Sequence, residues 1–216
     1  MAIPIVDSHV HLWPESHLPT IAWHSANNPL GAQYSVDEYL SATTQISSSS
    51  TSLRGFIYIE VARLSSADEA GEHGWKHVLD EVSYTTRITT GSPVPGEGHS
   101  ASQCDLLLAI IPWAPIPQGP AVLEKYMDLV RTRTLTDEVW LKVRGVRYLV
   151  QDKPDGTMLT QNFVDGLKWL GRRNLAFDLG VDARQGGLVQ LRQAVSMMRR
   201  VYDGVDEREQ VVIIIS

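Results

Sequence analysis

Short apolar runs alternate with amphipathic stretches along the chain. Six runs rich in β-branched residues stand out, at 3–6, 55–61, 106–111, 141–150, 175–181 and 211–215. Near-continuous apolar runs of this length are typical of strands buried on both faces, as in a parallel sheet flanked by helices. We therefore predict about six parallel strands.

Between these runs, apolar residues recur at helical spacing. The stripes follow the i, i+3, i+4, i+7 pattern of a helix that packs one face on a core. They comprise Trp75, Val78, Leu79 and Val82; Val122, Leu123, Tyr126 and Val130; Phe163, Leu167 and Leu170; and Leu188, Leu191, Val195 and Met198. Alternating strands and helices predict an α/β fold with βαβ crossovers. No stretch has the composition of a linker, so we predict one domain over residues 1–216.

Two irregular stretches interrupt the pattern. Residues 13–34 hold three prolines and follow the first predicted strand, so we predict a long βα loop there. Residues 89–103 are rich in glycine, serine and proline, which favour turns. We predict a mobile αβ connection there, with His99 exposed to solvent.

Composition and charge narrow the class of protein. Of 216 residues, 43% are hydrophobic and 20% charged, as in ordinary globular proteins. The net charge of -6 offers no excess of cations for phosphates, so we expect no nucleic-acid partner. The single cysteine, Cys104, cannot form an internal disulfide, and no apolar run approaches the length of a membrane helix. We predict a cytoplasmic protein without a membrane partner.

The run at 211–215 reads as a buried parallel strand, yet no helical pattern follows it. A parallel strand normally needs a crossover helix to cover it, and an uncovered strand can pair with another chain. We therefore expect the sequence to be a truncated piece of a longer protein. We also expect self-association through the uncovered sheet edge.

The segment 5–13 carries the clearest candidate chemistry. Because side chains alternate across a strand, Ile5, Asp7, His9 and His11 should share one face. Two imidazoles at i and i+2 can both reach one divalent cation such as Zn or Mn, with Asp7 orienting a ligand. The alternative is that His9 and His11 are core histidines satisfied by backbone carbonyls.

Two carboxylates are further candidates. Glu60 closes the second predicted strand at the level of His11, where it could act as a base or bind substrate hydroxyls. A surface position, or an ion pair with Arg63, is the alternative for Glu60. Asp178 lies inside the fifth apolar run, where an unpaired carboxylate would be costly, so it should have an arginine or metal-site partner.

Substrate-binding candidates come from the fourth strand and the first loop. Arg144 and Arg147 do not share a strand face, and Arg147, nearer the strand end, suits a carbonyl oxygen or a carboxylate. An ion pair with Asp152 or Asp155 is the alternative. Trp13 could supply a flat apolar wall for a substrate ring, although loop aromatics also pack on their own scaffold.

These residues carry a family resemblance. Residues 7–13, Asp-Ser-His-Val-His-Leu-Trp, resemble the strand-one signature of the amidohydrolase superfamily. Residues 144–152 and 177–179 resemble the amidohydrolase-related (amidohydrolase 2) branch. Within that branch the chain is most similar to sugar-lactone hydrolases of the fungal L-rhamnono-1,4-lactonase type.

The resemblance implies a distorted (β/α)8 TIM-type barrel with its site at the carboxyl ends of the strands. It implies that His9 and His11 bind a divalent metal, completed by a later histidine and a strand-eight aspartate. This sequence stops within strand six, so we expect an incomplete barrel and an incomplete metal site.

The implied reaction is attack of an activated water on the ring carbonyl of an aldono-1,4-lactone. We expect this chain to be weakly active or inactive. The alternatives are a non-catalytic truncated product, an α/β binding domain, or another amidohydrolase-type hydrolase or decarboxylase.

Overall fold

The computed structural model describes residues 2–25, 27–48, 50–67, 72–182, 184 and 187–216. The strands within these residues are β1 (Ile3–Val10), β2 (Thr51–Ile59), β3 (Leu107–Ile111), β4 (Gly145–Arg147), β5 (Ala176–Leu179) and β6 (Ile213–Ile215). The α-helices are α1 (Val36–Thr43), α2 (Glu72–Thr90), α3 (Pro120–Thr134), α4 (Asp137–Trp140), α5 (Gln161–Gly171) and α6 (Gly187–Tyr202). Each predicted apolar run thus contains or overlaps a strand, whereas α1 was not predicted.

The chain divides into two compact units, which are described separately. The first unit comprises Met1–Ser65, His77–Ile110 and Arg133–Lys142. The second comprises Ser66–Lys76, Ile111–Thr132 and Val143–Ser216. The single domain over residues 1–216 stays a prediction.

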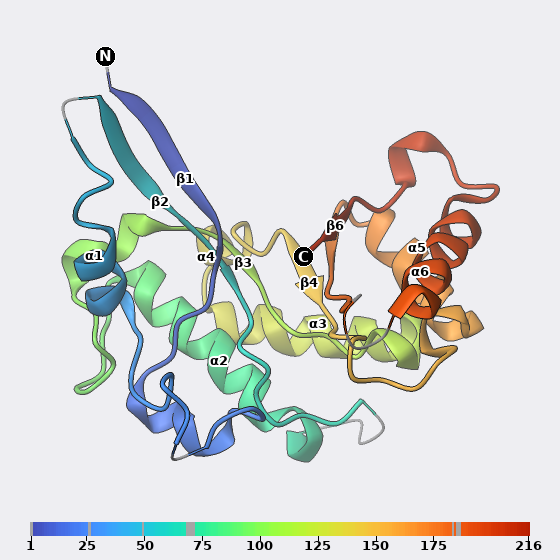
Figure 1. The fold of residues 1–216 in the computed structure, drawn as a ribbon, viewed down its shortest axis with the longest axis horizontal. Coiled ribbons are helices and arrows are strands. Elements are labelled where there is room, and N and C mark those ends of the chain that lie inside the picture. The colour runs from blue at the N-terminus through green and yellow to red at the C-terminus, as the bar shows by residue number, and fades with distance from the viewer. Residues whose placement is uncertain (1, 26, 49, 68–71, 183, 185–186) are drawn as a thin grey trace. The chain divides into compact units, whose positions relative to one another are not determined.

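The first unit is built on a sheet with the strand order β1-β2-β3. The long strands β1 and β2 run parallel, from the pair Ile3 and Thr51 to the pair Val10 and Tyr58, with two shifts of register between (Figure 1). Gly55 has a positive φ of 147°, and a Cβ there would lie 2.2 Å from the Leu106 carbonyl oxygen. This position therefore accepts only glycine, because the backbones approach too closely for a side chain.

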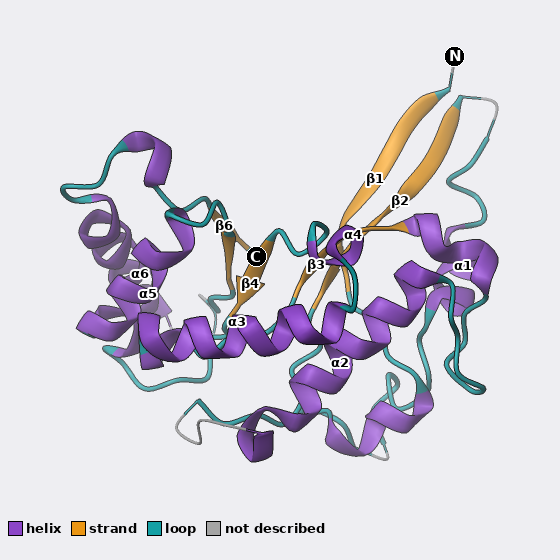
Figure 2. Cartoon of the chain, turned by 180° about the vertical axis from the view of Figure 1, so that it is seen from behind, coloured by secondary structure: helices purple, strands orange, loops and turns teal. Residues whose placement is uncertain are grey.

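The second unit contains the sheet β4-β5-β6, whose strands are all parallel. Helix α5 packs on β5 and against α6, and Figure 2 shows both helices beside this sheet. The predicted stripe Phe163, Leu167 and Leu170 is fully buried in α5. A parallel sheet with helices packed against it is the α/β arrangement that the sequence predicted.

Helix α6 buries a different face from the one predicted. Leu188 and Val195 are exposed, whereas the buried face is formed by Gln190, Ala194, Met197 and Val201. The Gln190 side chain accepts the Asp182 N–H at 2.8 Å and donates to the Val150 carbonyl at 3.1 Å. These bonds allow a polar residue to be buried. The helix was therefore predicted correctly, but the face predicted to be buried was wrong.

The connection between α2 and β3 also differs from its prediction. His99 is buried, with only 8% of its surface exposed, rather than exposed to solvent. Its Nε2 atom lies 3.3 Å from a carboxylate oxygen of Glu97, which is itself buried.

In the part of the chain that the structure describes, no helix is both long and apolar enough to cross a membrane.

Candidate functional site

His9, near the end of β1, and His11, in the segment after it, bring their imidazole rings together. The Nε2 atoms of His9 and His11 lie 3.1 Å apart, and the rings meet edge to face. Two nitrogens at Zn–N distances around a tetrahedral ion would be roughly 3.3 Å apart. The observed separation therefore fits a pair of imidazoles that share one cation.

Backbone contacts orient the His11 ring. His11 Nδ1 lies 3.0 Å from the Ile59 carbonyl oxygen, an acceptor only, at the end of β2. Nδ1 must therefore carry the proton in this hydrogen bond, which leaves the Nε2 lone pair directed at His9. His11 is half-buried and His9 is exposed, so the pair is open to solvent.

Asp7 supports the same strand end. Its Oδ1 atom accepts the His9 backbone N–H at 3.3 Å, and its Oδ2 atom lies 3.5 Å from the Tyr39 hydroxyl of α1. Burial, together with the Asp7 charge, raises the pKa of Tyr39 to about 12. Tyr39 therefore stays protonated at neutral pH and faces Asp7 as a donor.

The donor set for a metal is small. The described residues hold no group of three or more histidine, cysteine, aspartate or glutamate side chains that could bind a metal ion together. The distance between the Nε2 atoms of His9 and His11 fits a divalent ion, and so does the His11 tautomer, but the pair supplies only two ligands. Two ligands alone give an open coordination sphere and weak binding.

Glu60 follows β2 directly and is almost fully buried, with 1% of its surface exposed. The surface position considered for it is therefore wrong. Its Oε2 atom accepts the Ala62 N–H at 2.6 Å. The Ile59 carbonyl, one residue earlier, binds the His11 ring. A role of the Glu60 carboxylate as a base or in substrate binding stays a prediction.

The charge of Glu60 acts on a second buried carboxylate, which was not identified from the sequence. Burial, followed by the charge of Glu60, raises the pKa of Glu81 to about 8. Glu81 lies on α2 within one turn of the buried stripe residues Val78, Leu79 and Val82. The one signal for Glu81 in the sequence is that this charged residue stands beside the strongly apolar face of α2.

Asp178 and Arg147 form an ion pair in the second unit. Arg147 Nε lies 3.1 Å from Asp178 Oδ1, which also accepts the Ser216 hydroxyl at 2.9 Å. Asp178 has 1% of its surface exposed, so this contact agrees with the expectation that it has an arginine partner. The acidic partner of Arg147 is thus Asp178 on the neighbouring strand, rather than Asp152 or Asp155.

The remaining predicted substrate-binding residues differ in exposure. Arg144 precedes β4 and is exposed. Trp13 is only 4% exposed; it packs edge to face on Trp23 and Tyr34, and its Nε1–H donates to the Ala32 carbonyl. The loop aromatics therefore pack on one another, and contact of Trp13 with a sugar ring stays a prediction.

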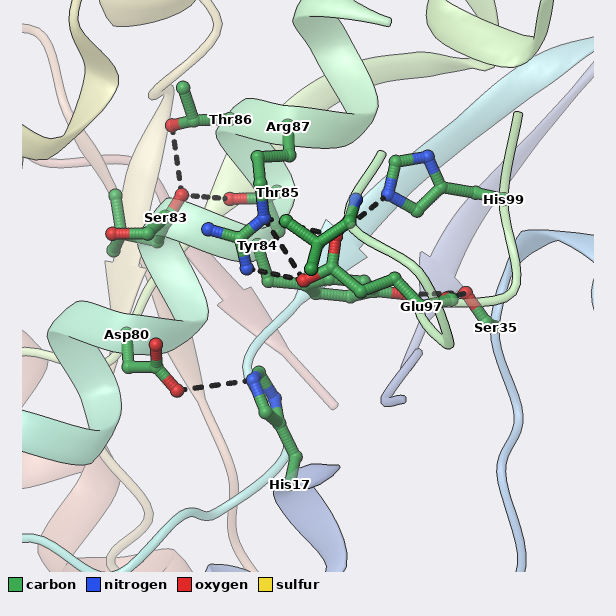
Figure 3. Close-up of polar contacts among 12 residues, drawn as sticks. His17, Ser35, Asp80, Ser83, Tyr84, Thr85, Thr86, Arg87, Glu97 and His99 are labelled. Atoms are coloured by element: carbon green, nitrogen blue, oxygen red, sulfur yellow. Dashed lines mark hydrogen bonds and ion pairs between the residues drawn. The ribbon is translucent and has the colours of Figure 1, made fainter. Parts of the chain in front are cut away.

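A network of buried polar side chains lies elsewhere in the first unit, and sequence reasoning missed it (Figure 3). His17 Nε2 lies 3.1 Å from Asp80, while Arg87 and His99 both contact Glu97. Burial alone would raise the pKa of Glu97, but hydrogen bonds from Arg87 and the Val94 N–H hold it below its ordinary value. The network is therefore a set of hydrogen-bonded polar side chains, including the ion pair of Arg87 and Glu97, that ties loop segments to α2.

Solved structures define the class of fold. The chain is similar to an amidohydrolase 2 from Bifidobacterium longum subsp. infantis, with a TM-score of 0.53 and 16% identity over 96% of this chain and 66% of that one. It is also similar to an amidohydrolase from Burkholderia multivorans solved with bound zinc, with a TM-score of 0.51 and 20% identity over 91% of this chain and 54% of that one. These likenesses confirm the predicted α/β fold, of which this chain spans part.

Sequence comparison adds a particular relative. The chain is 34% identical over 200 residues to the L-rhamnono-gamma-lactonase of Scheffersomyces stipitis, covering 91% of this chain and 57% of that protein. No protein-family model matches the chain. The chain is thus similar in sequence to a lactonase and in fold to amidohydrolases, which confirms the predicted resemblance.

Proposed function

We propose that the protein is a hydrolase that opens the ring of a sugar lactone, with His9 and His11 holding a divalent metal such as Zn or Mn. The observation that carries the proposal is the convergence of the two Nε2 atoms, with the His11 tautomer fixed by Ile59. The lactonase relative supports the substrate class. The chain spans 57% of that relative, so the activity of the whole protein is part of the proposal.

Each candidate residue has a role that its surroundings allow. A divalent ion at the histidine pair would supply Lewis-acid polarisation of a carbonyl oxygen. Asp7 orients His9 through the backbone, and Glu60 is the base that takes a proton from the attacking water. Within the second unit, Asp178 holds the Arg147 guanidinium in place, and substrate binding by Arg144 and Arg147 stays a prediction.

Metal binding by purified chain tests the proposal directly. We expect zinc binding to weaken by at least about tenfold in His9→Ala and in His11→Ala, because each removes one of two ligands. His73→Ala is the matched control, since His73 is exposed on α2, and it should bind zinc as the wild type does. Unchanged zinc binding in both His9→Ala and His11→Ala would contradict the proposed metal site.

Turnover tests the substrate class. We expect slow hydrolysis of L-rhamnono-1,4-lactone or another aldono-lactone, stimulated by zinc or manganese and lost in His9→Ala. Zinc binding without any hydrolysis of these lactones would contradict the lactonase assignment while leaving the metal site intact. Cytoplasmic location and the absence of nucleic-acid partners stay predictions from the sequence.

A further inference from the structure

Glu81 lies on α2 with its side chain buried in the first unit. Its Oε1 atom accepts the Val61 N–H at 3.2 Å and lies 2.9 Å from the Tyr58 hydroxyl. Its Oε2 atom has no hydrogen-bond partner among the described residues. An ionised carboxylate with one oxygen in apolar surroundings and no donor is costly, whereas a neutral acid tolerates that position.

The hydrogen bonds of the Tyr58 hydroxyl also indicate that Glu81 is protonated. The Tyr58 hydroxyl lies 3.2 Å from the Leu12 carbonyl oxygen as well as 2.9 Å from Glu81. A hydroxyl has one proton, and a backbone carbonyl can only accept. Both contacts are hydrogen bonds only when Glu81 is the donor to Tyr58 and Tyr58 is the donor to Leu12.

The surrounding groups favour a proton on Glu81 over one on Glu60. The Ala62 N–H stabilises a charge on Glu60 at 2.6 Å, and two neighbouring buried carboxylates resist being ionised together. Arg63, whose charge favours ionised Glu81, is itself bound to Asp80 at 2.9 Å. Burial, together with Glu81, Tyr84 and Glu60, keeps the pKa of Tyr58 well above its ordinary value, so Tyr58 retains its proton.

We propose that Glu81 is a positioning residue of the histidine site, held as a neutral carboxylic acid that donates to Tyr58, which in turn donates to the Leu12 carbonyl. Consecutive residues of β2 then hold consecutive residues after β1: Tyr58 binds Leu12, and the Ile59 carbonyl binds His11. The inference rests on the proposed function insofar as it concerns metal binding.

Infrared spectroscopy tests the protonation state without any ligand. Near pH 6, above the ordinary pKa of about 4.3 for glutamate, we expect the carbonyl band of a protonated carboxylic acid in the wild type. The band should vanish in Glu81→Gln and persist in Glu97→Gln, a matched change of a buried glutamate whose pKa is lowered. It should fade as the pH rises through about 8. Absence of the band, or its persistence in Glu81→Gln, would overturn the assignment.

Zinc affinity tests the positioning. A glutamine can accept from Val61 through its oxygen or donate to Tyr58 through its nitrogen, but it cannot do both from the position of Oε1. Glu81→Gln therefore keeps the packing and loses one of the two contacts. We expect zinc binding to weaken by about tenfold in Glu81→Gln and in Tyr58→Phe, with the double variant no weaker than either. Glu97→Gln should bind zinc as the wild type does. Wild-type affinity in both single variants would overturn the positioning role.

The two failures are distinguishable. A wild-type chain that binds no zinc contradicts the proposed function. In that case the infrared band alone judges the inference: its presence and its loss in Glu81→Gln support the neutral acid, and its absence refutes it.

Discussion

Two histidines of the first unit are held quite differently from the pair at the end of β1. His17 and His99 are buried, and each contacts a carboxylate with Nε2, Asp80 and Glu97 respectively. Burial lowers the pKa of both imidazoles and outweighs the carboxylates. Both side chains are therefore neutral in the folded protein at neutral pH.

This burial makes folding stability depend on pH. An unfolded chain binds protons on these histidines below about pH 6.5, whereas the folded chain resists them. The stability that they contribute is complete above about pH 6.5 and is lost as the pH falls toward their lowered folded values. We expect the urea midpoint to fall between about pH 7 and pH 5.

His99→Gln should reduce that slope, since glutamine does not titrate, and each unit of pKa difference corresponds to about 1.4 kcal/mol. His73→Ala, an exposed histidine on α2, serves as the control and should keep the wild-type slope. A midpoint in the wild type that does not change over this range would contradict the burial of neutral histidines.

At the same scale, the sequence predicted only the part of the site that is local in the chain. The i, i+2 spacing of His9 and His11 predicted their convergence, because strand geometry alone sets it. Tyr58 contacts Leu12, from which it is separated by 46 positions along the chain, and Glu81, from which it is separated by 23. Such contacts depend on how distant segments pack together, and the spacing of residues along the sequence does not reveal that packing.

Among the elements, β4 shows how closely two strands can approach. Gly145 pairs with Ala176 of β5, and a Cβ at Gly145 would lie 2.5 Å from the Ala176 carbonyl oxygen. The neighbour is backbone, which cannot move without disturbing the ladder. β4 spans only three residues, so such a disturbance affects the whole strand and the position of Arg147 at its end.

We therefore expect Gly145→Ala to destabilise the folded protein by about 1–3 kcal/mol through overpacking, measured by urea unfolding. Gly180→Ala is the control, because its new Cβ would first meet the Leu149 side chain, which can rotate away. Equal losses of folding stability in the two variants would contradict overpacking against the Ala176 backbone as the cause.

The element boundaries also show what the apolar pattern can predict. The six apolar runs located the strands, but β1 and β6 are largely exposed rather than buried on both faces as predicted. For α6 the pattern gave the helix but the wrong buried face. Gln190 is buried by hydrogen bonds to Val150 and to the Asp182 N–H, and a polar residue with distant partners breaks the apolar rule.

For the whole molecule, the exposed apolar residues near β6 matter most. β6 stands at the end of the strand order β4-β5-β6, and Val212, Ile214 and Ile215 are 65%, 45% and 66% exposed. An exposed apolar edge strand is a template for pairing with another chain. Self-association through this edge stays a prediction.

We expect sedimentation to show association that increases with protein concentration and decreases in Ile214→Lys, because a charge on an edge strand opposes pairing. Leu188→Lys is the matched control, since Leu188 is 66% exposed but lies on α6. A monomer at every concentration would contradict the prediction, as would equal effects of the two lysine variants.

Strand β1 is anchored unevenly along its length. Ile3 and Val6 are exposed, whereas Val10 and Leu12 are buried at the end that carries the histidines. Local opening should therefore begin at the start of the strand and leave the other end closed. The imidazoles are thus preorganised: the entropy of bringing them together belongs to folding, and a ligand that bridges them need not supply it.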